Sequence, residues 1–126
     1  MFLFFFFILD IYLFQKVLQF PFSRKEKILE ELISTEVNYV NDLQTVITGY
    51  RDKIASSNTK IASKAAMIFG NMDEICDFHT QNLLPELESC GTRPELIAET
   101  FLENSQQLTR IYAGKANLII RKIISF

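Results

Sequence analysis

The stretch that decides the fold runs from residue 24 to residue 55 and reads RKEKILEELISTEVNYVNDLQTVITGYRDKIA. It contains no proline and one glycine, Gly49. Steps of four and three along it mark one side of an α-helix, and the apolar residues on that side are Leu29, Ile33, Val40, Leu43, Ile47, Tyr50 and Ile54. The stretch therefore predicts one long amphipathic helix with a buried stripe.

Glu36 is the exception on this apolar stripe, because a carboxylate stands where an aliphatic side chain is expected. An unpaired buried charge is costly. Glu36 therefore lies either at the edge of the buried side or against a partner. The exposed side of the same helix carries a polar stripe at the same spacing, made of Glu31, Thr35, Asn38, Asp42 and Thr45.

The start of the helix is marked by Pro21, which pushes the residue before it out of the helical region. Ser23 and Glu26 then have the Ser-x-x-Glu spacing of a capping box. We therefore expect Ser23 to cap the helix. A polar break at residues 56–59 suits a turn after its end.

A second helix is predicted from about residue 60 to residue 89. Gly70 bends or interrupts it, and Pro85 costs about 3 kcal/mol inside a helix unless it lies at a kink. The residues expected on one side of this helix are Ile61, Ala65, Ile68, Met72, Ile75, Phe78 (or His79) and Leu83.

A third helix is predicted to begin at Pro94, which suits a first helical turn, with Thr92 as its cap. No strand alternation or Asn-Gly hairpin signal occurs in the sequence, so the expected fold class is all-α. The apolar residues expected along the third helix are Leu96, Ile97, Phe101, Leu102, Leu108, Ile111 and Tyr112.

Composition excludes several classes of function. The 126 residues include 13 basic and 15 acidic ones, and this net charge of −2 argues against a nucleic-acid-binding surface. Two cysteines and one histidine cannot supply a four-ligand zinc site, and the four glycines are too isolated for a phosphate loop. His79 lies at helical spacing from apolar residues, which favours packing over catalysis. We expect no metal, no cofactor and no covalent chemistry.

The first 22 residues differ from the rest, since they hold eight of the 12 phenylalanines. Translated non-coding sequence at the front of the gene fits this composition best. A membrane anchor is a second interpretation, although Asp10 near the middle is costly in a bilayer. A secretory signal is a third, although no basic region precedes the apolar run.

Two blocks of sequence resemble the Dbl-homology domain. Residues 31–43, ELISTEVNYVNDL, are similar to the family's first conserved region, E-L-[IVL]-x-T-E-x-x-Y-V-x-D-L. Residues 68–88, IFGNMDEICDFHTQNLLPELE, are similar to its pattern IFGN-x-x-E-I-x-x-F-H-x-x-x-L-x-x-L-E. The resemblance covers about residues 23–117 and implies an elongated helical bundle.

The resemblance also implies a function. Dbl-homology domains are guanine nucleotide exchange factors for Rho-type small GTPases, and they regulate the GTPase by binding its switch regions and stabilising its nucleotide-free state. Glu31 matches the family's glutamate that contacts switch I, and Thr35 and Asn38 are further candidates on the same stripe. Glu36 is expected to be a structural carboxylate behind the contact surface, and Tyr39 a packing residue.

This chain also departs from the family pattern. It lacks a match to the third conserved region, L-x-x-P-x-Q-R, and its similarity to the family ends near Asn117. We expect residues 1–22 and residues 118–126 to be unrelated to the partial domain at 23–117, and the fragment to exchange nucleotide poorly or not at all. The expected location is cytoplasmic, with membrane association through residues 1–22 or a missing pleckstrin-homology domain. A membrane-tethered helical adaptor is the alternative function.

Overall fold

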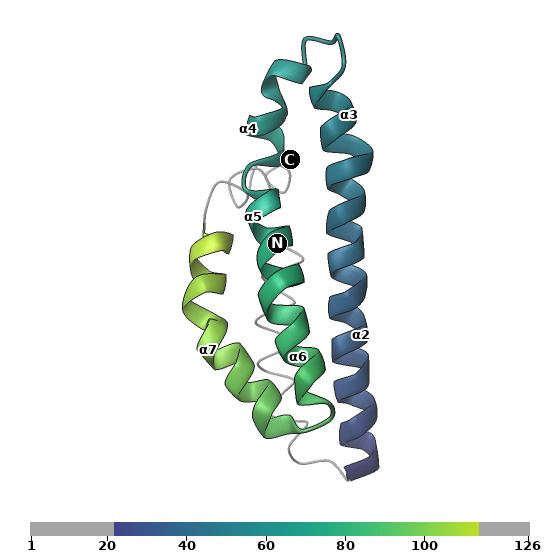
Figure 1. The fold of residues 1–126 in the computed structure, drawn as a ribbon, viewed down its shortest axis with the longest axis vertical. Helices are drawn as coiled ribbons and strands as arrows, with labels where there is room; N and C mark the ends of the chain where they lie inside the picture. Colours follow the sequence, from purple (N-terminus) through teal and green to yellow (C-terminus); the bar gives the residue numbers. More distant parts are fainter. Residues whose placement is uncertain (1–21, 114–126) are drawn as a thin grey trace, which may run out of the picture.

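The computed structural model describes residues 22–113, and every regular element in that range is helical, which confirms the all-α prediction. The chain forms three helical rods that run alternately up and down along one long axis (Figure 1). The first rod contains α2 (Phe22–Val46), the π turn η1 (Ile47–Arg51) and α3 (Asp52–Ala55). The elements of the second rod are η2 (Ala62–Lys64), α4 (Ala65–Phe69), α5 (Met72–Phe78), η3 (His79–Leu83) and α6 (Leu84–Cys90), and the third rod is α7 (Pro94–Tyr112).

The first rod confirms the long helix predicted over residues 24–55, with two corrections. Because α2 already includes Phe22, Ser23 lies inside its first turn and the predicted cap is wrong. The π turn holds one residue more than an α-helical turn, so it rotates the residues that follow by about 100°. Tyr50, predicted to be buried, is therefore 61% exposed, and Arg51 lies half-buried beside it.

The second rod is interrupted at Gly70, whose φ of 55° and ψ of −129° end α4. Residues with a side chain rarely adopt this backbone conformation, so glycine is required there. Farther along, Pro85 lies in the first turn of α6, directly after the π turn η3. The wide turn leaves room for the proline ring, which would clash with a carbonyl in a regular helix interior.

The third rod begins as predicted with Pro94 in its first turn. Its N-cap residue is Arg93, which has an extended backbone, so the predicted Thr92 cap is wrong. The preceding helix α6 ends at Cys90, and Gly91, with a φ of 59°, reverses the chain. Helix α7 then packs back against α5 and α6.

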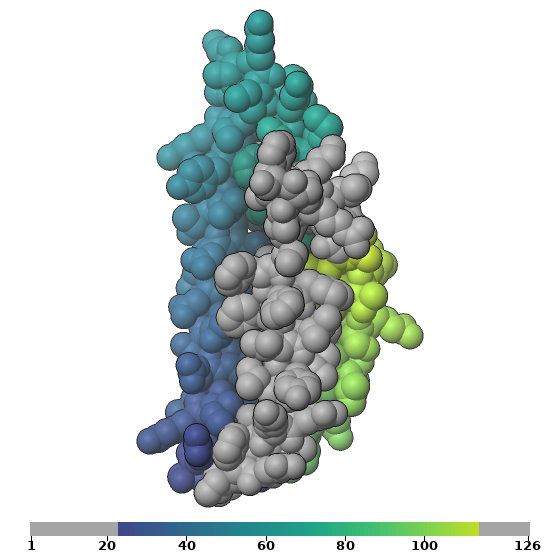
Figure 2. Space-filling model, turned by 180° about the vertical axis from the view of Figure 1, so that it is seen from behind, coloured from purple at the N-terminus to yellow at the C-terminus, as the bar shows by residue number. Residues whose placement is uncertain are grey.

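The core lies between the three rods, over the length that α7 covers. Its buried hydrophobic cluster comprises Leu29, Leu43, Ile47, Ile75, Cys76, Phe78, Leu83, Leu87, Cys90, Ile97, Leu108, Ile111 and Tyr112. Beyond the end of α7, the first two rods extend farther than the third and form a protruding end of the molecule (Figures 1 and 2). Ile61 and Ile68 lie in this end and are exposed, contrary to the prediction, because α7 ends before it reaches them.

No helix within residues 22–113 is long and apolar enough to cross a membrane. The segment at residues 1–22, interpreted above as non-coding sequence, anchor or signal, lies outside the described residues except for Phe22, as does the tail at residues 118–126.

We predict that Leu87→Ala lowers the free energy of unfolding by about 2–5 kcal/mol, because the side chain is 0% exposed and its removal leaves a cavity. Leu102→Ala is the matched control. Leu102 is 72% exposed, so this change should alter stability by less than about 0.5 kcal/mol. Urea unfolding monitored by circular dichroism measures both variants, and equal losses would contradict the position of the core.

Candidate functional site

The polar stripe predicted on the first helix lies on the outer side of α2. Glu31 and Asn38 are exposed, and Thr35 between them is half-buried. The Thr35 hydroxyl donates a hydrogen bond of 2.8 Å to the backbone carbonyl of Glu31. The Glu31 carboxylate itself faces solvent, and Asn38 lies about 10 Å farther along the helix. The stripe therefore offers polar groups to a partner along a straight helical segment.

Behind this stripe, a buried chain of hydrogen bonds joins all three rods. The carboxylate Oε1 of Glu36 on α2 contacts Nδ1 of His79 in η3. The other ring nitrogen of His79, Nε2, lies 2.7 Å from the hydroxyl of Tyr112 on α7. That hydroxyl lies 2.8 Å from the hydroxyl of Tyr39, which returns the chain to α2. Glu36 was expected either at the edge of the buried side or against a partner, and the structure shows that it lies against a partner.

One arrangement of hydrogens satisfies every atom in this chain. His79 Nδ1–H donates to the Glu36 carboxylate, and Nε2 accepts from the Tyr112 hydroxyl. The Tyr112 oxygen in turn accepts from the Tyr39 hydroxyl. Burial raises the pKa of Tyr39 and of Tyr112 above the usual value, so both phenols stay protonated and can donate.

Aromatic packing fixes the orientation of the His79 ring. The ring of Tyr39 lies edge-on to it with centroids 4.9 Å apart, and the ring of Tyr112 does so at 5.9 Å. Phe78 makes a third edge-on contact at 5.8 Å. Edge-to-face contacts of this kind are favourable for aromatic rings. The imidazole is therefore held both by its hydrogen bonds and by its neighbours.

Polar contacts at the margins of the core also link the rods. The side-chain amide of Asn71 donates to the backbone carbonyl of Ile111 at 2.7 Å, beside the Gly70 break. The Asn104 amide donates to the Glu86 carboxylate at 2.7 Å and so joins α7 to α6. These partners are far apart in sequence, so helical spacing alone could not identify them.

The sequence does not indicate the tyrosine partner of His79. Two signals were present: Glu36 is a carboxylate on an apolar stripe, and His79 lies among apolar residues of another helix. Buried polar groups are almost always paired. Glu36 and His79 could therefore have been paired with each other from the sequence, but nothing in the sequence identified Tyr112 as the third residue of the hydrogen-bond chain.

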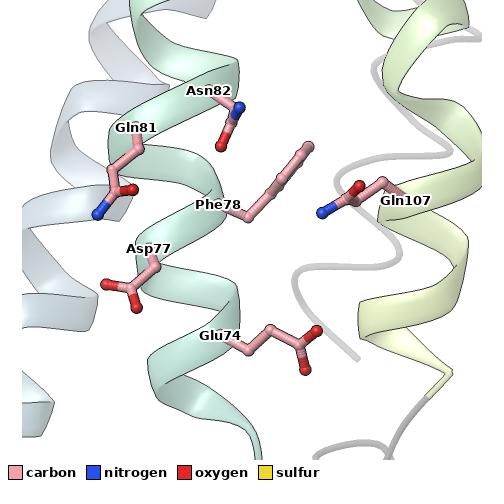
Figure 3. Close-up of a pocket in the computed structure, with 6 residues that line it drawn as sticks. All are labelled: Glu74, Asp77, Phe78, Gln81, Asn82 and Gln107. Carbon is pink, nitrogen blue, oxygen red and sulfur yellow. The ribbon is translucent and has the colours of Figure 1, made fainter.

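A shallow hollow of about 360 Å³ lies between the second rod and α7 (Figure 3). Phe78 and Gln107 point toward each other across it, and Glu74 at its lower end pairs with Arg110 at 2.8 Å. Its remaining lining residues are Asp77, Gln81 and Asn82. No nucleophile lies beside a base in this lining, and residues 22–113 contain no group of side chains arranged to hold a metal ion.

Comparison with known proteins identifies the family pattern that the chain carries. The RhoGEF domain family matches residues 28–115. The rat guanine nucleotide exchange factor DBS is 36% identical over 89 residues, which cover 66% of this chain and 8% of that protein. The human proto-oncogene DBL is 37% identical over 95 residues, which cover 71% of this chain and 10% of that protein.

The human Rho guanine nucleotide exchange factor 25 is 30% identical over 88 residues, which cover 68% of this chain and 15% of that protein. The chain therefore spans about a tenth of the length of the curated relatives that it matches. The matched residues include the polar stripe on α2 and all four members of the buried hydrogen-bond chain.

We predict that Glu36 and His79 are energetically coupled. His79→Ala should lower stability by about 3–5 kcal/mol, because it leaves the Glu36 carboxylate buried without its partner. The variant carrying both Glu36→Ala and His79→Ala should lose at least about 1 kcal/mol less than the two single losses added together. Denaturant unfolding of the four proteins measures this cycle, and strictly additive losses would contradict the coupling.

We also predict that alkaline pH destabilises the fold through its buried tyrosines. Unfolded tyrosines ionise near pH 10, whereas burial raises the pKa of Tyr39 and Tyr112 in the folded chain. Above about pH 10 the folded state therefore binds more protons than the unfolded state, and stability falls as the pH rises. Each of these tyrosines contributes a slope of up to about 1.4 kcal/mol per pH unit.

Tyr112→Phe removes one of these slopes. Unfolding free energies of the parent and the variant, measured from about pH 8 to about pH 11, should therefore converge as the pH rises above 10. A constant difference between the two proteins across this range would show that Tyr112 ionises equally in both states.

Proposed function

This chain belongs to the RhoGEF domain family, and we propose that it is a guanine nucleotide exchange factor domain for Rho-family small GTPases. The observation that carries the proposal is the family match over residues 28–115, which includes the solvent-facing stripe on α2. Relatives that cover about two thirds of the chain bear the names of guanine nucleotide exchange factors. The match favours this function over the membrane-tethered adaptor.

The proposed mechanism is binding without covalent chemistry. An exchange factor accelerates nucleotide release when it binds the nucleotide-free GTPase more tightly than the nucleotide-bound form. The exposed side of α2 suits this task, because its polar groups face solvent and can bond a segment of the GTPase. We propose a GTPase of the Rho or Rac type as the partner.

Within this surface, Glu31 is proposed to contact switch I of the GTPase. Its exposed carboxylate can accept hydrogen bonds from backbone N–H groups or hydroxyls of the switch. Asn38 can both donate and accept through its amide. Thr35 already donates its hydroxyl hydrogen to the Glu31 carbonyl, so it is available to the partner as an acceptor.

We propose that Glu36 and Tyr39 support this surface from behind. Glu36 follows Glu31 by five residues, which places it roughly 140° around the helix. The bonds from Glu36 to His79 and from Tyr39 to Tyr112 therefore prevent α2 from rotating about its own axis. A cytoplasmic location accompanies the proposal, with membrane association through residues 1–22 or through a pleckstrin-homology domain outside this sequence.

We predict that the chain binds a nucleotide-depleted Rho or Rac GTPase at least tenfold more tightly than the GDP-bound form. Glu31→Ala should weaken the nucleotide-free complex by about tenfold or more, because it removes hydrogen bonds to a charged acceptor. Binding is measured by titration against a panel of GTPases, and release of fluorescent GDP is measured in parallel. The release assay also tests the expectation that 126 residues alone exchange slowly.

Glu30→Ala is the matched control for Glu31→Ala. The two glutamates are neighbours, both are exposed, and their removal changes the net charge equally. Glu30→Ala should alter binding by less than about twofold, since only the stripe faces the partner. Equal effects of the two changes would remove Glu31 from the contact, and no preference for any nucleotide-free GTPase would contradict the proposed function.

A further inference from the structure

The protruding end of the first two rods differs in charge from the rest of the molecule. Residues 53–69, which we call the basic tip, contain Lys53, Lys60 and Lys64 and no aspartate or glutamate. The whole chain, in contrast, has a formal net charge of −2. All three lysines are exposed, and none forms an ion pair with another residue of the described range 22–113. Their charges are therefore available to an anionic partner.

The basic tip also exposes large apolar side chains. Met67 is 68% exposed, Ile61 is 54% exposed, and Ile68 is exposed to a smaller extent. These are three of the five large hydrophobic residues with exposed side chains in the described part of the chain. A fourth, Tyr50, lies in the π turn that leads into the tip. Exposed apolar residues gathered in this way often mark an interaction site.

Several backbone groups of the tip are bonded within its turns. The amide of Ser57 donates to the carbonyl of Ile54 at 3.2 Å, and the amide of Ala62 donates to the carbonyl of Thr59 at 3.1 Å. The Ser57 hydroxyl also donates to the Ile54 carbonyl at 2.7 Å. These bonded groups lose fewer hydrogen bonds to water when they enter a less polar medium.

We propose that the basic tip docks on an anionic lipid bilayer, with its lysines at the headgroups and with Ile61 and Met67 in the interfacial region. Basic residues are attracted to anionic lipids, and neighbouring apolar side chains add burial at the same surface. The shape favours a bilayer over an acidic protein. The tip protrudes at one end of the molecule, which suits a flat surface (Figures 1 and 2). It consists of the end of α3, the turn that follows, η2 and α4.

Vesicle binding by the full chain tests the role of the lysines. The probes are vesicles of phosphatidylcholine alone and vesicles with added phosphatidylserine. Each lysine near an anionic surface strengthens binding about fivefold, so Lys60→Glu with Lys64→Glu should weaken binding to the anionic vesicles by at least about 25-fold. The apolar residues 1–22 would bind both kinds of vesicle, so the difference between the two vesicles isolates the electrostatic part of the binding.

The matched control is Lys25→Glu with Lys27→Glu, which changes the net charge by the same amount at the opposite end of the first rod. This pair should weaken anionic-vesicle binding by less than about fivefold. Equal losses in the two double variants would show a general charge effect and would overturn the proposal. So would an equal affinity of the parent chain for both kinds of vesicle.

Fluorescence tests whether the apolar residues enter the bilayer. The chain has no tryptophan, so a single introduced tryptophan reports its own surroundings. Met67→Trp should shift its emission to shorter wavelength on anionic vesicles, whereas Leu102→Trp, at an equally exposed position on α7, should not. An unshifted Met67→Trp together with binding to polyglutamate as tight as to vesicles would assign the tip to an acidic protein instead. No GTPase is present in these assays, so their outcome is independent of the proposed exchange function.

Discussion

The arrangement of the three rods depends on one buried chain of hydrogen bonds, from Glu36 through His79 and Tyr112 to Tyr39. The surrounding core is apolar, and apolar contacts alone tolerate small rotations and slides of one helix past another. A carboxylate in the interior does not tolerate such movements, because they would separate it from its partner and an unpaired charge there is strongly unfavourable. The pairing therefore favours the register in which Glu36 reaches His79.

This constraint links the interior to the proposed contact surface. Glu36 and Tyr39 lie on the inner side of α2, and the exposed stripe lies on its outer side. A surface that binds one state of a partner better than another must keep its own groups in place, since mobile groups lose entropy on binding. The buried hydrogen-bond chain restricts rotation of α2, so little of this entropy remains to be lost on binding. The aromatic contacts around His79 restrict rotation of the imidazole in the same way.

Much of the fold could be predicted from helical spacing, because the first helix and the start of α7 at Pro94 depend on local residue patterns. The Glu36 anomaly was also visible in the sequence. Its network was not, since Glu36 and His79 are 43 residues apart and Tyr112 lies on a third helix. The prediction that Tyr50 is buried was wrong for a different reason. The π turn adds one residue to a helical turn, and no local sequence pattern indicated it.

The first rod connects the two proposed surfaces, because it carries the Glu31 stripe and ends in the basic tip at Lys53, and this places a geometric condition on how they could work together. Glu31 and Lys53 are 22 residues apart along α2, η1 and α3, which corresponds to about 33 Å at 1.5 Å per residue. A molecule docked through its basic tip would therefore hold the Glu31 stripe about 30 Å from the bilayer if the rod stood upright. Because Lys53 and the stripe lie on the same helical rod, tilting that rod is the motion that would change this distance.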